Sequence, residues 1–386
     1  MKVAVITTSR ADYGLLYWPL KKLSQDQFFD ARLVVAGSHL SPLGGYSVRR
    51  IEADGWDIDC RIEMMLGSDT ALGACKSLAL AIVGFAEYFS RSLPDLVLVV
   101  GDRYEMTAAA QSAVMLNLPI AHIAGGDVTE GSFDDTFRHC ITKMSHIHLP
   151  SNEPARQRII QMGENPDCVI TVGSPGIDYI LRRERLSRAE IERRLGFAFK
   201  KRNMLVTFHS ETVDRTGTSS FAEVLAALGT LDDQTGIVFT MPNADPDGLA
   251  IAQMIHEFCA TRANAISAVN LGSDLYLSLM AEVTAVVGNS SSGLYEAPTL
   301  GTPTVNIGNR QKGRLCASSV INAVPAAESI QKAIHAAFDM SCDDVVNPYG
   351  DGNASERIVT ALRKFPNPAA LVRKSFQSNA LLCQKL

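Results

Sequence analysis

The sequence predicts an α/β protein built from two doubly wound domains, each with a mostly parallel sheet between layers of helices. Its strand candidates are continuous apolar runs rather than alternating patterns, which is typical of parallel strands buried on both faces. Helical stretches separate these runs, and the strand–helix alternation stops and then starts again near the middle of the chain. With 386 residues, the chain is long enough for two domains with complete hydrophobic cores.

The first domain is expected to span residues 1–173. Helices are predicted between its apolar runs, and a short strand at 145–149 follows the fourth helix. The other strands are predicted at 2–6, 31–36, 95–100, 119–123 and 168–172, and the helices at 13–24, 70–92, 104–116, 133–144 and 154–162.

The second domain is expected to span residues 174–366, after a glycine-rich segment that we interpret as a hinge. It is predicted to begin with a charged helix at 181–195 and to end before a segment, 367–386, that belongs to neither repeat. An amphipathic helix predicted at 368–384 can cross back to the first domain. The strands of the second domain are predicted at 203–208, 236–240, 265–269, 284–288 and 304–307, with helices between them.

Composition and charge exclude several classes of protein. The chain is 46% hydrophobic and 20% charged, as soluble globular proteins are, and its net charge of −5 argues against a nucleic-acid partner. No apolar run is judged long enough to cross a bilayer, so no membrane partner is expected. The start MKVAVITTSR is interpreted as a buried strand rather than a signal peptide. Eight cysteines without metal or C-x-x-C spacing predict free thiols in the cytoplasm.

Polar residues gather directly after the predicted strands, where open α/β sheets bind their ligands. Two such edges facing each other would form a cleft. No G-x-G-x-x-G follows the first strand, so a dinucleotide cofactor is not expected. The polar segments are TTSRADYG (7–14), GDRYE (101–105), AGGDVTEG (124–131), FHSET (208–212) and MPNADPDG (241–248).

The segment 288–310, GNSSSGLYEAPTLGTPTVNIGNR, is the most informative of these. A strand ends in Gly288, and a serine-rich stretch then begins a helix predicted at 294–299, which offers N–H groups and hydroxyls to a phosphate. Glu296 is placed to hold a ribose hydroxyl, and Arg310 to add a bidentate contact. The alternative is a serine-capped helix after an ordinary strand.

The end of the strand at 95–100 combines a carboxylate and a guanidinium, Asp102 and Arg103, beside a helix start. We favour base and phosphate chemistry there over the alternative of a capping Asp with an Arg partner. Arg10 can reach a diphosphate from the first strand end. For that segment alone, the favoured interpretation is that Asp12 caps the helix and Arg10 is solvated.

Histidines and further acids give weaker signals. The run 122–139 is dense in acids, and carboxylates that share a site can divide into an acid and a base. Asp134 and its neighbour also suit a helix cap. His209, at a strand end, is equally compatible with ligand binding and with capping. His146 and His148 share one strand face, but no third ligand is suitably spaced, so a structural role is favoured over a metal site.

Together these motifs carry a family resemblance. In order and over nearly the whole chain, TSRADYG, GDRYE, IAGGDVTEG, DD-x-x-RH-x-ITK, FH-x-x-T, GNSSSG and VNIG-x-RQ resemble the hydrolysing UDP-N-acetylglucosamine 2-epimerases of bacterial sialic-acid and legionaminic-acid synthesis. The resemblance implies a GT-B arrangement of two Rossmann-like domains with the active site in the cleft. It implies a UDP-sugar as partner, no cofactor, no metal, and a homodimer or homotetramer.

The resemblance also implies a reaction. UDP is eliminated from C1 of UDP-N-acetylglucosamine as the C2 proton is lost, and water then adds to the 2-acetamidoglucal to release N-acetylmannosamine. The same reaction on a UDP- or GDP-linked 2,4-diacetamido-2,4,6-trideoxy sugar is an alternative. A GT-B glycosyltransferase and a non-catalytic sugar-nucleotide binder are further alternatives.

Residue roles follow from the resemblance by position. Asp102 and Asp134 match catalytic acids, and His209 is assigned to both catalysis and nucleotide binding. The family's glutamate after His-Ile is Ala124 here, so Asp127 or Glu130 is expected to take over its chemistry. The residues assigned to UDP are Arg10, Arg103, His209, Asn243, Leu271 through its backbone, Ser290, Ser291, Ser292, Glu296 and Arg310.

Overall fold

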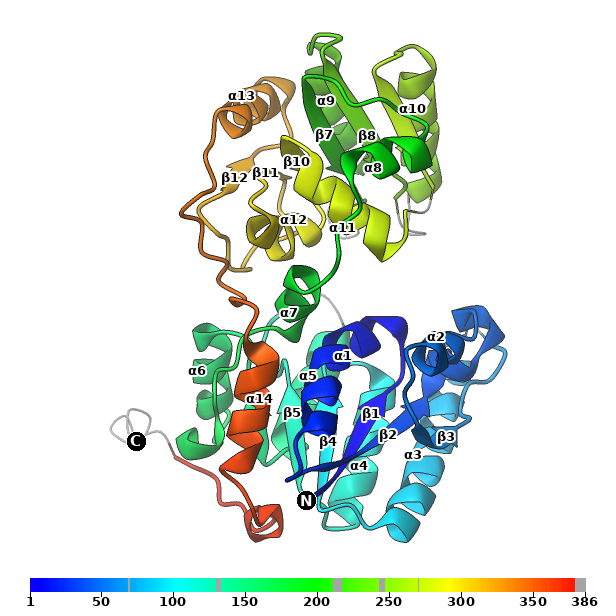
Figure 1. Cartoon of the computed structure of the whole chain (residues 1–386), viewed down its shortest axis with the longest axis vertical. Coiled ribbons are helices and arrows are strands. Elements are labelled where there is room, and N and C mark those ends of the chain that lie inside the picture. Colours follow the sequence, from blue (N-terminus) through cyan, green and yellow to red (C-terminus); the bar gives the residue numbers. More distant parts are fainter. Residues whose placement is uncertain (69, 130–132, 211–216, 243–246, 270, 379–386) are drawn as a thin grey trace. The chain divides into compact units, whose positions relative to one another are not determined.

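The computed structural model of the chain (Figure 1) describes residues 1–68, 70–129, 133–210, 217–242, 247–269 and 271–378. Its contacts divide the chain into two compact units. Unit 1 comprises Met1–Tyr179 and Tyr349–Leu386, and unit 2 comprises Ile180–Pro348. Each unit contains one six-stranded sheet in which every paired strand is parallel, so the predicted pair of doubly wound α/β folds is confirmed.

The sheet of unit 1 has the strand order β3-β2-β1-β4-β5-β6. Its strands are β1 (Lys2–Thr7), β2 (Asp30–Ala36), β3 (Ile58–Ile62), β4 (Leu96–Val100), β5 (Ile120–Ile123) and β6 (Ile147–Leu149). Its helices are α1 (Arg10–Gln25), α2 (Val48–Ala53), α3 (Ala71–Ser92), α4 (Tyr104–Met115), α5 (Phe133–Met144), α6 (Glu153–Gln161), α7 (Pro175–Leu181) and α14 (Ala354–Arg363). Short 3₁₀ turns are η1 (Gly37–Leu40), η2 (Pro42–Gly44), η3 (Pro166–Cys168) and η5 (Pro368–Leu371).

The sheet of unit 2 repeats this order as β12-β11-β10-β7-β8-β9. Its strands are β7 (Arg202–Thr207), β8 (Thr235–Thr240), β9 (Ala265–Ala268), β10 (Ala285–Gly288), β11 (Thr304–Ile307) and β12 (Val320–Ala323). Its helices are α8 (Arg188–Leu195), α9 (Gly217–Gly229), α10 (Gly248–Ala260), α11 (Gly272–Glu282), α12 (Ser292–Tyr295), the 3₁₀ turn η4 (Ala297–Leu300) and α13 (Ala327–Phe338).

Each sheet has a point where the strand order reverses. In unit 1 the chain proceeds outward from β1 to β3 and then returns to place β4 on the other side of β1. In unit 2 the strands β7 and β10 are neighbours in the same way. Connections leave such a pair of strands in opposite directions, so a crevice opens at their carboxyl ends. The fold therefore places β1 with β4, and β7 with β10, where ligands are expected.

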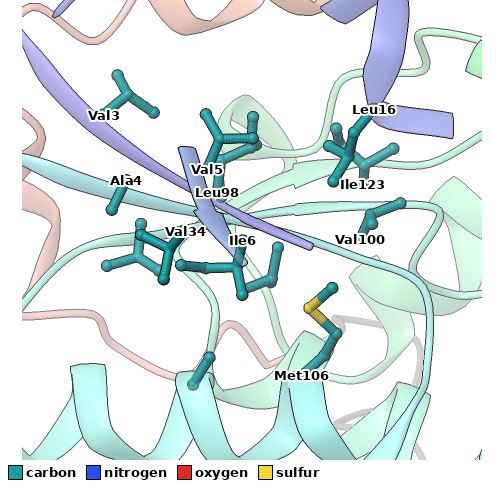
Figure 2. Close-up of a cluster of buried hydrophobic side chains, with 14 of the residues drawn as sticks. Val3, Ala4, Val5, Ile6, Leu16, Val34, Leu98, Val100, Met106 and Ile123 are labelled. Carbon is teal, nitrogen blue, oxygen red and sulfur yellow. The ribbon is translucent and has the colours of Figure 1, made fainter. Parts of the chain in front are cut away.

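The sheets are buried on both faces, as the apolar runs predict. Every residue from Val3 to Ile6 in β1 is fully buried. In Figure 2, Val5 lies on the side of Leu16 from α1, and Ile6 lies on the side of Met106 from α4. This two-sided burial explains why the central strands contain no alternating polar positions.

Two partly buried edge strands, β3 and β12, were not predicted from the sequence. Their sequences mix polar and apolar residues and so lack the continuous apolar run of a central strand. The predicted strand at 168–172 is wrong: it is an extended segment with a single bridge, between Val169 and His148, beyond the turn η3. The predicted helix at 181–195 is confirmed only in its second half: α7 ends at Leu181, and α8 covers Arg188–Leu195.

The predicted C-terminal helix at 368–384 does not form in the described residues, where η5 is followed by extended chain up to residue 378. Contacts with the rest of unit 1 hold this segment extended. The ammonium of Lys374 donates to the carbonyls of Lys143 and Ser145, at 2.6 and 2.7 Å, and the Gln377 N–H donates to the Gly163 carbonyl at 2.9 Å. These hydrogen bonds with distant residues override the helical pattern.

The chain returns to unit 1 earlier than expected, at Tyr349 rather than at 367. The returning helix α14 packs against α1. Its first turn is capped by the buried carboxylate of Asp178, which accepts the Ala354 and Ser355 N–H groups at 2.9 and 2.8 Å. A residue 176 positions earlier in the chain thus supplies the cap that α14 lacks in its own sequence.

One helix, α3, is long and apolar enough to cross a membrane by length and composition alone. This corrects the expectation that no such stretch exists. Core helices of soluble proteins also pass that test, and α3 packs along α4 within unit 1.

Replacing Asp178 by Ala is expected to destabilise unit 1, because two buried N–H groups lose a charged acceptor. We expect a loss of about 3 kcal/mol in the free energy of unfolding, measured by urea denaturation. Asp351→Ala is the control, since this exposed carboxylate also pairs near α14, with Arg357 at 2.7 Å. It should cost less than about 1 kcal/mol. Equal losses in the two variants would contradict the capping role.

Candidate active site

The tip of β1 is organised around a buried carboxylate. Asp12 accepts hydrogen bonds from the hydroxyls of Thr7 and Thr8, at 2.6 and 2.7 Å, and forms a capping box with Ser9 at the start of α1. Burial alone would raise the pKa of Asp12, but hydrogen bonds from His39, Thr7, Thr8 and the Ser9 N–H outweigh it and lower the pKa below its usual value. The favoured interpretation of this segment is confirmed: Asp12 caps the helix, and Arg10 beside it is exposed.

The tip of β4 presents Asp102 and Arg103 beside the start of α4. Arg103 makes a bidentate pair with the fully buried carboxylate of Glu105, at 3.1 and 2.8 Å. Burial lowers the pKa of Arg103, but Glu105 outweighs this and the net pKa is raised, so the guanidinium stays charged. Its side chain is still 42% exposed, so it can contact an anion while it neutralises Glu105.

His122, at the end of β5, fixes the backbone next to Asp102. Its Nε2–H donates to the Gly101 carbonyl at 2.7 Å, and Nδ1 lies 3.2 Å from the Thr142 hydroxyl. Burial lowers the pKa of His122 to about 3, so the ring stays neutral and keeps one donor and one acceptor. A Cβ at Gly125 would lie 2.7 Å from this ring, which explains a glycine at that position.

Arg138 was not among the predicted site residues, yet its guanidinium pairs with the predicted acid Asp102 and with Asp135. The Arg138 side chain is only 8% exposed. Its Nη2 donates to the carboxylate of Asp102, and its Nη1 donates to the carboxylate of Asp135 at 3.1 Å. It also donates to the Asp127 carbonyl at 2.9 Å and to the Thr129 hydroxyl at 3.1 Å. Its position three residues after Asp135, on one helix face, was the available signal.

Asp127 and Glu130 are the predicted replacements for the glutamate that Ala124 lacks. Ala124 lies at the end of β5 with φ of 61°, a backbone conformation rarely adopted by residues other than glycine. The carboxylate of Asp127 accepts from Ser151 Oγ at 3.0 Å and from Asn152 Nδ2 at 2.8 Å, which commits it to the start of α6. Glu130 lies outside the described residues. Asp134 stands in the first turn of α5, partly buried.

In unit 2, an asparagine fastens the tips of β7 and β10 together. Asn289 is fully buried, accepts the His209 N–H at 2.8 Å and donates to the His209 carbonyl at 2.8 Å. Its own carbonyl accepts from Gln311 at 2.8 Å and from Arg310 at 3.3 Å. Only glycine fits before it, because Gly288 has φ of 139° and a Cβ would lie 1.9 Å from the Thr207 carbonyl oxygen.

The serine segment begins a very short helix. The predicted helix at 294–299 is instead divided into α12 and the turn η4. Ser291 occupies the N-cap position of α12, and the hydroxyls of Ser290 and Ser292 lie 3.0 Å apart. The Ser292 hydroxyl also lies 2.5 Å from that of Tyr276, whose pKa is raised to about 12 by burial.

Glu296 is a predicted nucleotide contact with one unsatisfied carboxylate oxygen. Its Oε2 is out of contact with solvent and has no hydrogen-bond partner among the described residues. Burial raises the pKa of Glu296 to about 7, although a hydrogen bond from its own backbone opposes this. A buried carboxylate oxygen without a donor is costly, and a ligand hydroxyl would relieve that cost.

A pocket of about 400 Å³ opens at the carboxyl edge of the unit 2 sheet. This volume lies in the range of small-molecule sites. Four of the residues assigned to UDP line it together: His209, Leu271, Ser290 and Ser292. The other lining residues are Thr207, Thr240, Met241, Ala268, Val269, Gly272, Ser273 and Tyr276. Arg310 is exposed at a loop after β11, and Asn243 lies outside the described residues.

His148 in β6 and His146 directly before it both contact other protein groups, which indicates a structural role. His148 Nε2 lies 3.1 Å from the carboxylate of Glu164, and His146 Nδ1 accepts the Ile120 N–H at 3.1 Å. Burial lowers the pKa of His146 to about 4. Over the part of the chain that the structure describes, no group of three or more His, Cys, Asp or Glu side chains is arranged to hold a metal ion.

Two parallel sheets of the same strand order in one chain, one of them with a small-molecule pocket at its switch point, define a GT-B type of fold. The fold is shared with UDP-N-acetylglucosamine 2-epimerase from Neisseria meningitidis bound to UDP-GlcNAc, at a TM-score of 0.77 and 18% identity, covering 94% of this chain and 100% of that chain. It is shared more distantly with a lipopolysaccharide outer core galactosyltransferase, WaaB, at a TM-score of 0.54 and 11% identity, covering 94% and 99%.

The chain belongs to the UDP-N-acetylglucosamine 2-epimerase family, whose model matches residues 21–363. Its relatives include a GDP/UDP-N,N'-diacetylbacillosamine 2-epimerase (hydrolyzing) from Campylobacter jejuni, 35% identical over 83% of this chain and 84% of the relative. A UDP-N,N'-diacetylbacillosamine 2-epimerase (hydrolyzing) from Legionella pneumophila is 33% identical over 97% and 98%. These relatives place the chain among the hydrolysing 2-epimerases, as the motifs predict.

Arg138→Met should destabilise unit 1, since the carboxylates of Asp102 and Asp135 lose the cation they share. We expect a loss of about 2 to 3 kcal/mol in urea denaturation, because breaking a buried ion pair from one side is costly. Arg61→Met, which removes an exposed partner of Glu52, is the control and should cost at most about 1 kcal/mol. A loss no larger than that of the control would rule out the organising role of Arg138.

The raised pKa of Glu296 predicts a pH-dependent stability of unit 2. The folded carboxyl keeps its proton up to a pH of about 7, whereas its usual pKa is 4.5, so wild type loses stability as the pH rises between these values. Glu296→Gln has no such penalty. At pH 8 it should be more stable than wild type by up to about 3 kcal/mol, and at pH 4 the two should match. Thermal melts across this range would contradict the assignment if the difference did not change with pH.

Proposed function

We propose that this chain converts UDP-N-acetylglucosamine and water into N-acetylmannosamine and UDP. The observation that carries the proposal is the unit 2 pocket, which is lined by four of the residues assigned to UDP from the sequence, together with the Oε2 of Glu296, a buried oxygen without a donor among the described residues. Family membership supports the reaction type. The proposal requires groups from both units: unit 2 would hold UDP, and unit 1 would supply the acids.

In this proposal, unit 2 stabilises the leaving group. Leu271 would hold the uracil through its backbone, and Glu296 would accept a hydrogen bond from a ribose hydroxyl. Ser290, Ser291 and Ser292 would contact the diphosphate with hydroxyls and N–H groups at the start of α12, and Arg310 would add a positive charge. Arg10 and Arg103 would add charge from unit 1. The C2 hydrogen is only weakly acidic, so stabilising the departing UDP must supply much of the rate.

Unit 1 would supply the proton transfers. Asp102 would take the proton from C2 while the C1–O bond breaks and UDP leaves with the bonding electrons, which forms the 2-acetamidoglucal. Arg138 holds Oδ2 of Asp102, so Oδ1 is the oxygen that would face the substrate. Water would then add to C1 and a proton to the opposite face of C2, with Asp134 as a second acid. In unit 2, His209 is the residue that we assign to catalysis as well as to nucleotide binding.

A second candidate substrate is a nucleotide-linked N,N'-diacetylbacillosamine, a 2,4-diacetamido-2,4,6-trideoxy sugar. Two observations favour it. The relatives named for that sugar are 35% and 33% identical to this chain, whereas the UDP-N-acetylglucosamine 2-epimerase of Neisseria meningitidis is 27% identical. In addition, Ala124 removes a carboxylate beside the expected sugar position, which suits a ring with fewer polar hydroxyls.

Three finer expectations accompany the proposal. A role in nonulosonic (sialic) acid synthesis is supported by a relative named polysialic acid biosynthesis protein P7 from Escherichia coli, 32% identical over 94% of each chain. A cytoplasmic location is supported by the thiols of the seven cysteines in the described residues, all of which are free. A homodimer or homotetramer is the assembly that the family resemblance implies.

The substrate can be identified by incubating the purified chain with UDP-N-acetylglucosamine, UDP-N-acetylgalactosamine and the UDP- and GDP-linked diacetamido sugars, without any acceptor. Proton NMR should detect one free 2-epimerised sugar, together with its free nucleotide. Release of UDP only when an acceptor is added would support a glycosyltransferase instead. Release of nothing from any sugar nucleotide would support a non-catalytic binder.

Variants in the two units should have different effects, on kcat in unit 1 and on the Kd for UDP in unit 2. Asp102→Asn should lower kcat by about 10² to 10⁴-fold, while the Kd for UDP stays within about threefold of wild type. Glu296→Gln should raise that Kd about tenfold, because the ribose would lose a charged acceptor. Glu52→Gln, an exposed acid of unit 1, is the control and should change neither. An Asp102→Asn variant with full turnover would refute the proposed base.

A further inference from the structure

Five hydroxyl groups line the pocket of unit 2, and they come from separate elements of the fold. Thr207 ends β7, Thr240 ends β8, Tyr276 lies on α11, and Ser290 and Ser292 follow β10. Several of these hydroxyls contact one another: Thr240 donates to Thr207 at 2.8 Å, and the oxygens of Tyr276 and Ser292 lie 2.5 Å apart. The direction of such contacts decides which hydrogen is left for a ligand.

The direction is fixed at the serine end. The Ser292 hydroxyl donates to Ser290 Oγ at 3.0 Å, and the Ser292 N–H approaches the same oxygen at 3.4 Å. A hydroxyl has two acceptor lone pairs and one hydrogen. Both acceptor positions of Ser290 are therefore engaged, and its own hydrogen remains to be donated. Because Ser290 lines the pocket, a ligand there can accept that hydrogen.

Tyr276 stands at the head of this chain of hydroxyls. The single hydrogen of the Ser292 hydroxyl is engaged with Ser290, so the short contact between Ser292 and Tyr276 requires the phenol as donor. A phenol is a stronger acid than an alkyl hydroxyl, which favours the same direction. The chain thus proceeds from Tyr276 to Ser292, from Ser292 to Ser290, and from Ser290 into the pocket.

The surroundings of Tyr276 keep its phenol in the donor form. Burial raises the pKa of Tyr276 to about 12, although hydrogen bonds with Ser292, Thr207 and Ser290 partly oppose this rise. Without a ligand, the Ser290 hydrogen can turn back towards Tyr276, which is one of its hydrogen-bonding neighbours. A phosphate oxygen carries negative charge and is a stronger acceptor than a phenol oxygen, so a bound phosphate would draw this hydrogen into the pocket.

We propose that Tyr276 is a positioning residue for the leaving group. Its phenol aligns the hydroxyls of Ser292 and Ser290 so that Ser290 donates to a diphosphate oxygen of the bound nucleotide. This inference rests on the proposed function, because it requires UDP in the unit 2 pocket. Each donation polarises the next hydroxyl of the chain, which strengthens the last hydrogen bond, the one made to the ligand.

The chain would act on the charge that develops during the reaction. When the C1–O bond breaks, its electron pair passes to the β-phosphate oxygen, and UDP gains one negative charge. A donor that already points at the diphosphate stabilises this charge without reorienting. Each oxygen of the chain keeps its own proton throughout. Since α11 begins at Gly272, directly after Leu271, the helix that carries Tyr276 also starts at the residue assigned to uracil.

A purely structural role for Tyr276 makes a different prediction. If the phenol only held the pocket wall in place, its loss would loosen the pocket and weaken binding of the base and of the diphosphate alike. If the phenol orients Ser290, the loss is confined to ligands that carry the diphosphate. Uridine and UDP share the base and ribose and differ in the diphosphate, so comparing them separates the two roles.

The test measures the Kd of the full-length protein for UDP, by isothermal titration calorimetry, and for uridine, by NMR titration. Tyr276→Phe keeps the ring and removes only the phenol oxygen. Its Kd for UDP should rise about tenfold, because the hydrogen bond to a charged group is weakened, while its Kd for uridine stays within about twofold of wild type. Tyr88→Phe, which removes a buried phenol oxygen of unit 1 from Asp59 at 2.7 Å, is the matched control and should change neither.

A double-mutant cycle shows whether Tyr276 acts through Ser290. Ser290→Ala should raise the Kd for UDP at least as much as Tyr276→Phe does, and combining the two substitutions should add less than about twofold. Ser292→Ala interrupts the chain at its middle and leaves the Tyr276 ring in place. It should reproduce the loss of UDP affinity with uridine affinity retained, which keeps the inference testable even where Tyr276→Phe does not fold.

Three results would overturn the positioning role: an unchanged Kd for UDP in Tyr276→Phe, equal losses for UDP and uridine, or fully additive effects of Tyr276→Phe and Ser290→Ala. Turnover of sugar nucleotides is a separate measurement on the same samples. Wild type that binds UDP and shows the expected cycle but converts no sugar nucleotide would count against the proposed reaction only. Wild type with turnover, together with a Tyr276→Phe variant of full UDP affinity, would count against this inference only.

Discussion

In each unit, the candidate ligand-binding edge depends on one constraint of parallel sheets, the reversal of strand order between neighbouring strands. It places the tips of β1 and β4 together in unit 1 and those of β7 and β10 together in unit 2. At these points the backbone must turn sharply, and glycines with positive φ, Gly101 and Gly288, permit it. Helices α1, α4 and α12 begin soon after the tips of β1, β4 and β10, so unpaired N–H groups gather where the strands place polar side chains.

The two units satisfy their polar groups in opposite ways. In unit 1 the acids are already neutralised: Arg138 pairs with two carboxylates, Glu105 pairs with Arg103, and Asp12 accepts several hydrogen bonds. In unit 2, Asn289 satisfies the backbone of His209, but the Oε2 of Glu296 has no donor among the described residues. A site that transfers protons needs carboxylates held in fixed positions. A site that binds a ligand can contain an unpaired acceptor, which a donor group of the ligand then satisfies. This contrast is consistent with the proposed division of roles.

The central strands and strand ends could be predicted from sequence because two-sided burial and polar strand tips leave clear local patterns. The edge strands β3 and β12 could not, since half-exposed segments resemble loops. Likewise, the extended tail around Lys374 depends on carbonyls that lie more than 200 residues earlier. In the site, the serine segment was predictable from its composition. The role of Arg138 was not, because three of its four partners, Asp102, Asp127 and Thr129, lie outside its own helix. Asp127 proved to be committed to the start of α6.

Elimination followed by hydration is tested most directly by turnover of the sugar nucleotide in ²H₂O enriched with ¹⁸O. We expect a free sugar with one deuterium at C2 and UDP without ¹⁸O, because the C1–O bond breaks and the C2 proton is replaced from solvent. A sugar without deuterium at C2, or ¹⁸O in the phosphate of UDP, would contradict elimination followed by hydration. Epimerised sugar still attached to UDP would contradict hydrolysis altogether.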